Sequence, residues 1–66
     1  MENEDKIKII TLFVNDLESD IRAIELLKVR DEITGTPEDL IYWDNRIKEK
    51  TISIGKFREK IKELQS

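Results

Sequence analysis

Six aliphatic residues in the first third of the chain recur in alternating steps of three and four, and this spacing constrains the fold more than any other feature. These seam residues are Ile7, Ile10, Val14, Leu17, Ile21 and Ile24. Because an α-helix has about 3.6 residues per turn, such a heptad pattern places all of them on one side of a helix. The pattern predicts a long helix over about residues 4–33 that ends at Thr34-Gly35, where glycine can adopt the left-handed conformation of a helix C-terminus.

Further apolar residues lie outside the seam and widen the apolar surface of this helix. They extend it beyond the arc of about 100° that is typical of a one-sided surface helix. They are Ile9, Leu12, Phe13, Ala23 and Leu27. We therefore expect the long helix to contact two neighbours. Since a chain of 66 residues has little material for a core, we predict a homodimer in which the long helices pair through the seam residues.

The second half of the chain opens with strong signals for a new helix. Thr36 is a good N-cap because its hydroxyl can accept a hydrogen bond from an unpaired backbone N–H, and Pro37 suits the first helical position. An apolar stripe follows, which predicts a second helix over about residues 37–49. The stripe consists of Leu40, Trp43 and Ile47.

A short break at residues 50–53 separates this stripe from a third predicted helix over about residues 53–64. Ser53 is a good N-cap, and Phe57 lies four positions further on, where it can pack against Ile52 as a hydrophobic staple. The sequence thus predicts an all-α single domain over residues 1–66, with a long N-terminal helix, a C-terminal helical hairpin and a dimeric bundle. A continuous helix from 37 to 64 is the alternative.

The composition excludes several kinds of chemistry. The chain has no Cys and no His, which removes disulfides, the usual zinc ligands and Cys–His or Ser–His–Asp catalysis. Its two glycines lie 20 residues apart and form no phosphate-binding loop. We expect a protein without enzymatic activity, cofactor, metal or small-molecule substrate. No run of 18 apolar residues exists, and the absence of Cys fits a soluble, cytoplasmic protein that does not enter membranes.

The expected function is that of a small protein interaction module, such as an adaptor, inhibitor, regulator or assembly factor. Ile41 and Tyr42 fall outside the stripe of the second helix, so they are candidates for a partner surface recognised through a helix face. Burial by a second subunit or by the long helix is the competing explanation for these two residues.

Charge is distributed unevenly, which supports a second hypothesis. Residues 1–45 contain 5 Lys/Arg and 12 Asp/Glu, whereas residues 46–66 contain 7 Lys/Arg and 3 Asp/Glu. This basic C-terminal segment could contact nucleic-acid phosphates. The possible contacts are Arg46, Lys48, Lys50, Lys56, Arg58, Lys60 and Lys62. Attraction between the acidic and basic parts of the fold is the simpler explanation. A third hypothesis is a purely structural subunit of a larger complex.

Overall fold

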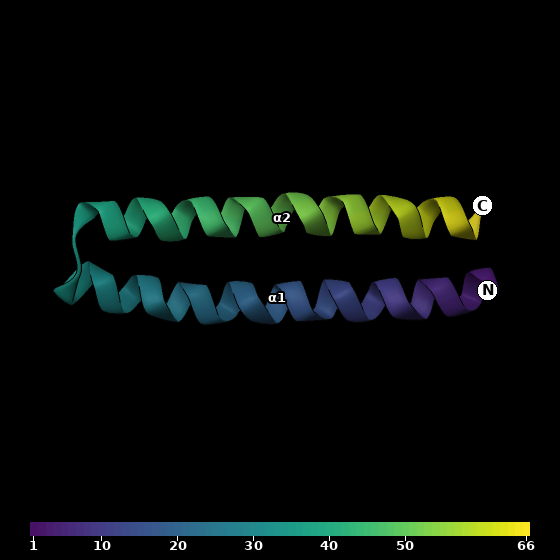
Figure 1. Cartoon of the computed structure of the whole chain (residues 1–66), viewed down its shortest axis with the longest axis horizontal. Coiled ribbons are helices and arrows are strands. Elements are labelled where there is room, and N and C mark those ends of the chain that lie inside the picture. Colours follow the sequence, from purple (N-terminus) through teal and green to yellow (C-terminus); the bar gives the residue numbers. More distant parts are fainter.

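The structure, a computed structural model that describes all 66 residues, is a single helical hairpin (Figure 1). Helix α1 spans Asn3–Thr34 and helix α2 spans Pro37–Gln65. The two helices lie side by side in opposite directions, so both termini are at one end of a rod 48 Å long and 14 by 13 Å across. At that end the Asn3 side-chain amide donates to the carbonyl oxygen of Leu64 at 3.3 Å.

The prediction of three helices is wrong, because α2 continues without interruption through residues 50–53. The residues of α2 that face α1 follow an unbroken heptad series. The series consists of Leu40, Trp43, Ile47, Lys50, Ile54, Phe57, Ile61 and Leu64, all of which are buried or half-buried. Its one charged member, Lys50, forms an ion pair with Asp20 of α1 at 3.4 Å. Because this partner neutralises the charge, the series can pass through Lys50 without a break.

The turn between the helices differs in detail from the expected left-handed glycine. Gly35 has φ −98° and ψ −169°, which is extended backbone. Its N–H donates to the carbonyl oxygen of Asp31 at 2.8 Å and so ends α1. The expected start of the next helix is confirmed: the Thr36 hydroxyl accepts from the Asp39 N–H at 3.3 Å, and the Asp39 carboxylate accepts from the Thr36 N–H at 3.0 Å. This reciprocal capping box, with Pro37 in the first turn, fixes where α2 begins.

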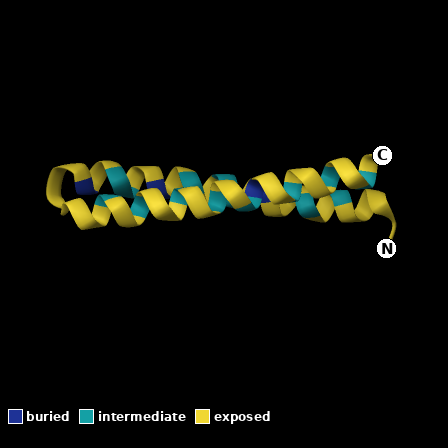
Figure 2. Ribbon diagram, turned by 90° about the horizontal axis from the view of Figure 1, so that it is seen from above, coloured by how far each residue is buried: buried dark blue, intermediate teal, exposed yellow.

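Few positions of the hairpin are buried, and Figure 2 shows them as separate dark-blue patches among longer exposed stretches of both ribbons. Val14, Ile24 and Ile54 are the only buried apolar residues, and no large side chain is completely buried. Complete burial of one such side chain contributes about 1.5–3 kcal/mol, and the half-buried apolar residues contribute less each, so the total is small against the conformational entropy of ordering the chain. The isolated hairpin therefore has the limited stability expected of a small fold without staples.

Ion pairs between the helices set their register. Lys28 of α1 lies 2.7 Å from Asp44, and Arg58 of α2 lies 3.2 Å from Glu18. Each exposed pair contributes only about 0–1 kcal/mol to stability. Asp20–Lys50 and Glu18–Arg58 nevertheless match the acidic first helix to the basic end of the second. The opposite charges of the two parts of the sequence thus partly neutralise each other within one chain.

The two glycines generate a matched pair of stability predictions. A Cβ on Gly55 would meet no atom within 4 Å, so Gly55→Ala should stabilise the helix interior by about 0.5–1 kcal/mol. A Cβ on Gly35 would lie 2.6 Å from the Asp31 Cβ, so Gly35→Ala should destabilise the turn by about 1–3 kcal/mol. Thermal unfolding followed by circular dichroism measures both. A lower melting temperature for Gly55→Ala would contradict a continuous α2.

Candidate interaction surfaces

The seam residues that were expected to pair two chains face α2 of the same chain. Val14 and Ile24 are buried in this contact, and the other four are half-buried. A second copy could reach them only if the hairpin opened. The homodimer therefore stays a prediction, but within the folded hairpin it needs a different face of α1.

Large apolar side chains are exposed along the whole hairpin. Ten of them are exposed, whereas three are buried. The exposed residues are Met1, Ile9, Leu12, Phe13, Leu26, Val29, Ile33, Ile41, Tyr42 and Ile52. The expectation that Ile9 and Phe13 lie on a second apolar surface of the long helix agrees with this exposure. Leu27, assigned to the same surface, is half-buried. Sequence reasoning missed Leu26, Val29 and Ile33, although the spacing of Leu26 and Ile33 by seven residues was a usable signal.

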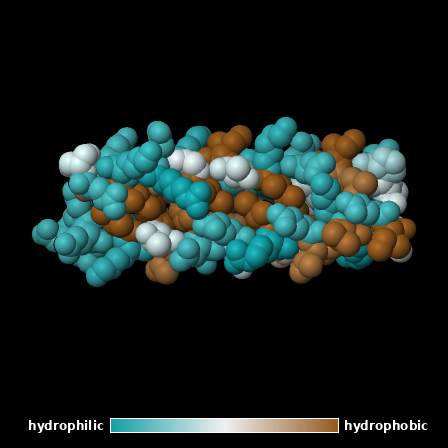
Figure 3. Space-filling view, turned by 180° about the vertical axis from the view of Figure 1, so that it is seen from behind, coloured by the Kyte–Doolittle hydropathy of each residue, from teal (hydrophilic) through white to brown (hydrophobic).

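A shallow groove of about 350 Å³ lies between the helices near their middle. Phe13, Asp16 and Leu17 of α1 and Phe57 of α2 line it. The two phenylalanine rings are 5.6 Å apart and inclined by 48°, which is a favourable geometry for aromatic pairs. Figure 3 shows apolar surface along the line between the helices and at the loop end of α1. The groove is open to solvent, and Asp16 is its one charged residue.

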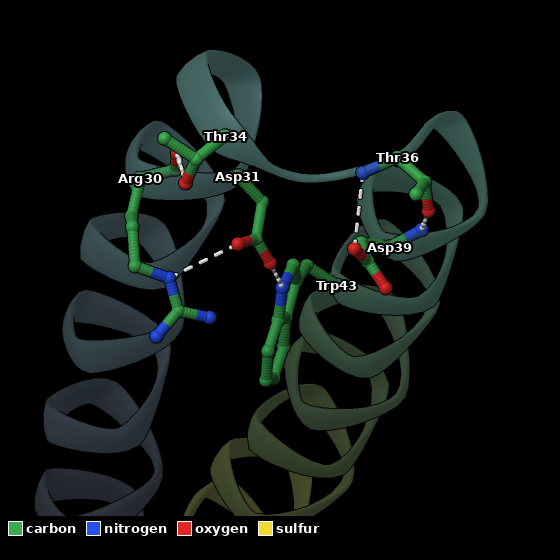
Figure 4. A network of polar contacts seen from close by, with 6 residues as sticks. All are labelled: Arg30, Asp31, Thr34, Thr36, Asp39 and Trp43. Atoms are coloured by element: carbon green, nitrogen blue, oxygen red, sulfur yellow. Dashed lines mark hydrogen bonds and ion pairs between the residues drawn. The ribbon is translucent and has the colours of Figure 1, made fainter.

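The loop end of the hairpin contains a connected group of polar and aromatic side chains (Figure 4). Asp31 is buried, and one of its carboxylate oxygens accepts from the indole N–H of Trp43 at 2.6 Å. The other oxygen accepts from Nε of Arg30 at 3.0 Å. The hydrogen bond from Arg30, and then that from Trp43, lower the pKa of Asp31. Through Trp43, this group fastens α2 to the last turn of α1.

The proposed partner residues lie next to this group and are exposed. Ile41 is 61% exposed and Tyr42 is 55% exposed, so neither is covered by α1. The Tyr42 ring meets the Trp43 ring edge-on, with centroids 4.9 Å apart and an angle of 76°. Trp43 itself is half-buried, as expected from its place in the stripe of α2. Tyr42 is thus an exposed aromatic residue supported by an anchored one.

The basic segment of α2 is largely occupied by acidic partners. Four of its seven cations form ion pairs: Arg46 with Glu49, Lys50 with Asp20, Arg58 with Glu18, and Lys60 with Glu63. The remaining three, Lys48, Lys56 and Lys62, are exposed and have no ion-pair partner. The structure therefore does not bring all seven cations together as a free basic surface.

Two further features are absent from the structure. No group of three or more His, Cys, Asp or Glu residues is arranged to hold a metal ion. Neither helix has a stretch that is both long and apolar enough to cross a lipid bilayer. Comparisons of the chain with protein-family models, with curated proteins and with solved structures gave no match.

The lowered pKa of Asp31 generates a pH prediction. A carboxyl whose pKa is lower in the folded state contributes stability above its unfolded pKa, and this contribution is lost as the pH falls. Asp31→Asn should therefore be less stable than the parent protein at pH 7, and the difference should shrink below about pH 4, near the ordinary pKa of aspartate. Urea unfolding, followed by the fluorescence of the single tryptophan Trp43, measures this difference in the free energy of unfolding at each pH.

Glu59→Gln is the matched control, because it removes an exposed carboxylate that belongs to no ion pair. Its effect on the free energy of unfolding should stay small at pH 7. If Asp31→Asn were as stable as the parent at pH 7, the Asp31–Trp43 contact would not hold the loop end together.

Proposed function

We propose that this protein is a small non-enzymatic interaction module, an adaptor, inhibitor or assembly factor, that recognises another protein through exposed helix faces. The observation that carries the proposal is that ten large hydrophobic residues are exposed, while only three are buried and eleven are half-buried. Single exposed apolar residues are normal, but clustered ones mark sites of association. A cytoplasmic location, expected from the sequence, is part of the proposal.

Tyr42 is the anchor of the proposed partner surface. Residues that dominate binding energy are often Trp, Tyr or Arg, and a side chain that is already ordered loses less entropy on binding. Tyr42 is supported by the edge of Trp43, which is held in turn by the carboxylate of Asp31. Ile41 adds an exposed apolar neighbour to the same surface. This surface is therefore organised before any partner arrives.

The charges around Tyr42 indicate the chemistry of the partner. Glu32, at the end of α1, and Glu38, in the first turn of α2, are exposed and form no ion pair. Both lie at the loop end, within ten residues of Tyr42 in sequence. A complementary partner has an apolar pocket for the tyrosine ring and basic residues at its rim, since opposite charges favour association and register.

Nucleic-acid binding is the alternative, and it rests on the exposed Lys48, Lys56 and Lys62 of α2. Three phosphate contacts supply weak, strongly salt-dependent affinity. A structural subunit is the second alternative, favoured by the small core. Substitution of the three lysines by Glu distinguishes nucleic-acid binding from protein recognition, because it removes the phosphate contacts but leaves the surface centred on Tyr42 intact. Low helicity of the isolated chain at 25 °C would favour the second alternative.

Tyr42→Ala should weaken binding to the protein partner by at least about 30-fold, because loss of a hot-spot residue costs about 2 kcal/mol or more. The hairpin should stay folded, since more than half of the Tyr42 surface is already in solvent. A photo-reactive phenylalanine analogue placed at position 42 will cross-link the partner in living cells, and mass spectrometry will identify the cross-linked protein. Titration calorimetry then measures the affinity of each variant for that protein.

The matched control carries the same photo-reactive residue at Lys48, an exposed position on α2 without an ion pair. Tyr42→Phe should retain most of the affinity because it keeps the ring. Identical adducts from positions 42 and 48, or unchanged affinity of Tyr42→Ala for the captured protein, would contradict the proposed surface.

A further inference from the structure

The hairpin exposes more surface than a globular chain of its mass. Its accessible surface is 5142 Å², whereas a folded monomer of 7.8 kDa typically exposes about 4,400 Å². The excess of roughly 750 Å² is close to the ~800 Å² that each partner buries in a standard protein interface. One further interface of ordinary size would thus give the chain the burial that its own fold does not supply.

A second heptad series on α1 provides a surface for such an interface. Its members, which we call the outer row, alternate in steps of three and four on the side of α1 away from the seam residues, with Asp16 at the edge of this side, where it also lines the groove toward α2. The outer row consists of Ile9, Leu12, Asp16, Ser19, Ala23, Leu26, Arg30 and Ile33, all of which are exposed. Leu26 and Ile33 are exposed by 74% and 80%, so α2 leaves them almost uncovered.

The ends and the centre of the outer row match themselves in the antiparallel direction, while the layers between them pair a leucine with a charged residue. When two copies of α1 are placed antiparallel about the middle of the row, Ile9 lies opposite the Ile33 of the second copy, and Ser19 lies opposite its Ala23. The apolar ends therefore meet each other. The small central residues allow the two helix backbones to approach closely, as small residues do at helix contacts.

Charge selects the same direction. In the antiparallel arrangement Asp16 lies opposite Leu26 of the second copy and Arg30 lies opposite Leu12, so Asp16 is about one helical turn from Arg30 on both sides of the two-fold axis. In the parallel arrangement Asp16 would face Asp16 and Arg30 would face Arg30, and such like-charge contacts oppose association. Arg30 uses only Nε to bond Asp31 within its own chain, so both terminal nitrogens of its guanidinium can serve an intermolecular pair.

We propose that the outer row of α1 is a homodimer interface, occupied by α1 of a second copy in antiparallel orientation. The Ile41–Tyr42 surface lies on α2 and takes no part in the row, so this proposal is independent of the proposed function. The dimer leaves each hairpin closed, with its own seam residues packed on its own α2.

Sedimentation equilibrium of the full chain tests whether a second copy occupies the outer row. The parent protein should sediment at twice 7.8 kDa at ~50 μM. Leu26→Asp should raise the dissociation constant roughly 100-fold, because it places a charge in the interface. Ile52→Asp is the matched control on α2, where Ile52 is 55% exposed, and it should remain dimeric. A monomeric parent protein, or equal effects of both variants, would overturn the proposal. So would capture of a foreign protein by the outer row of a monomeric chain.

Disulfide trapping tests the orientation, because the natural chain has no cysteine. A mixture of Ile9→Cys and Ile33→Cys should form a mixed disulfide under mild oxidation, while each variant alone should form little. Asp16→Arg should weaken the dimer about tenfold, because it places a positive charge close to Arg30 of the second copy. Efficient trapping of each cysteine variant with itself would indicate parallel helices and reject the antiparallel interface. Circular dichroism of every variant verifies that the hairpin remains helical.

Discussion

The packing of two heptad series against each other is the interaction on which the rest of the structure depends. The seam residues of α1 meet the matching series of α2, and this contact contains all three buried apolar residues. Apolar packing alone tolerates a shift of register by one heptad. The Asp20–Lys50 pair does not, because a shift would leave Lys50 facing an apolar layer without a partner. Packing thus supplies the attraction, while the two-residue turn at Gly35-Thr36 and the ion pairs between the helices specify the alignment.

The loop end adds a second constraint by tying the end of α1 to the start of α2. Gly35 permits close approach to Asp31, and Asp31 then receives the indole N–H of Trp43. The same group supports the exposed ring of Tyr42. Stability and the proposed recognition are therefore linked here. The outer row of α1 shares only Arg30 with this group, so one surface is available for a second copy and another for a foreign partner.

Much of the fold could be predicted from local patterns, and the main error has a clear physical cause. The length of α1 and the start of α2 followed from heptad spacing and from Thr36 and Pro37. A break at residues 50–53 was expected because Ser53 is a good N-cap and Ile52 and Phe57 are spaced as a hydrophobic staple. Whether a lysine interrupts an apolar series depends on an opposing acid. That acid is Asp20, 30 residues away in sequence, and local propensity does not identify it.

By itself, the sequence determined that the chain is helical, where its turn lies, and that α1 has more apolar surface than one neighbour can cover, because helix periodicity and capping are local properties. Only the tertiary structure decided which apolar row meets which partner. The seam residues and the outer row have the same spacing, and pattern alone led to pairing the seam with another chain. Since α2 lies next to α1 in the same molecule, it reaches the seam first at a high effective concentration. The outer row is left exposed.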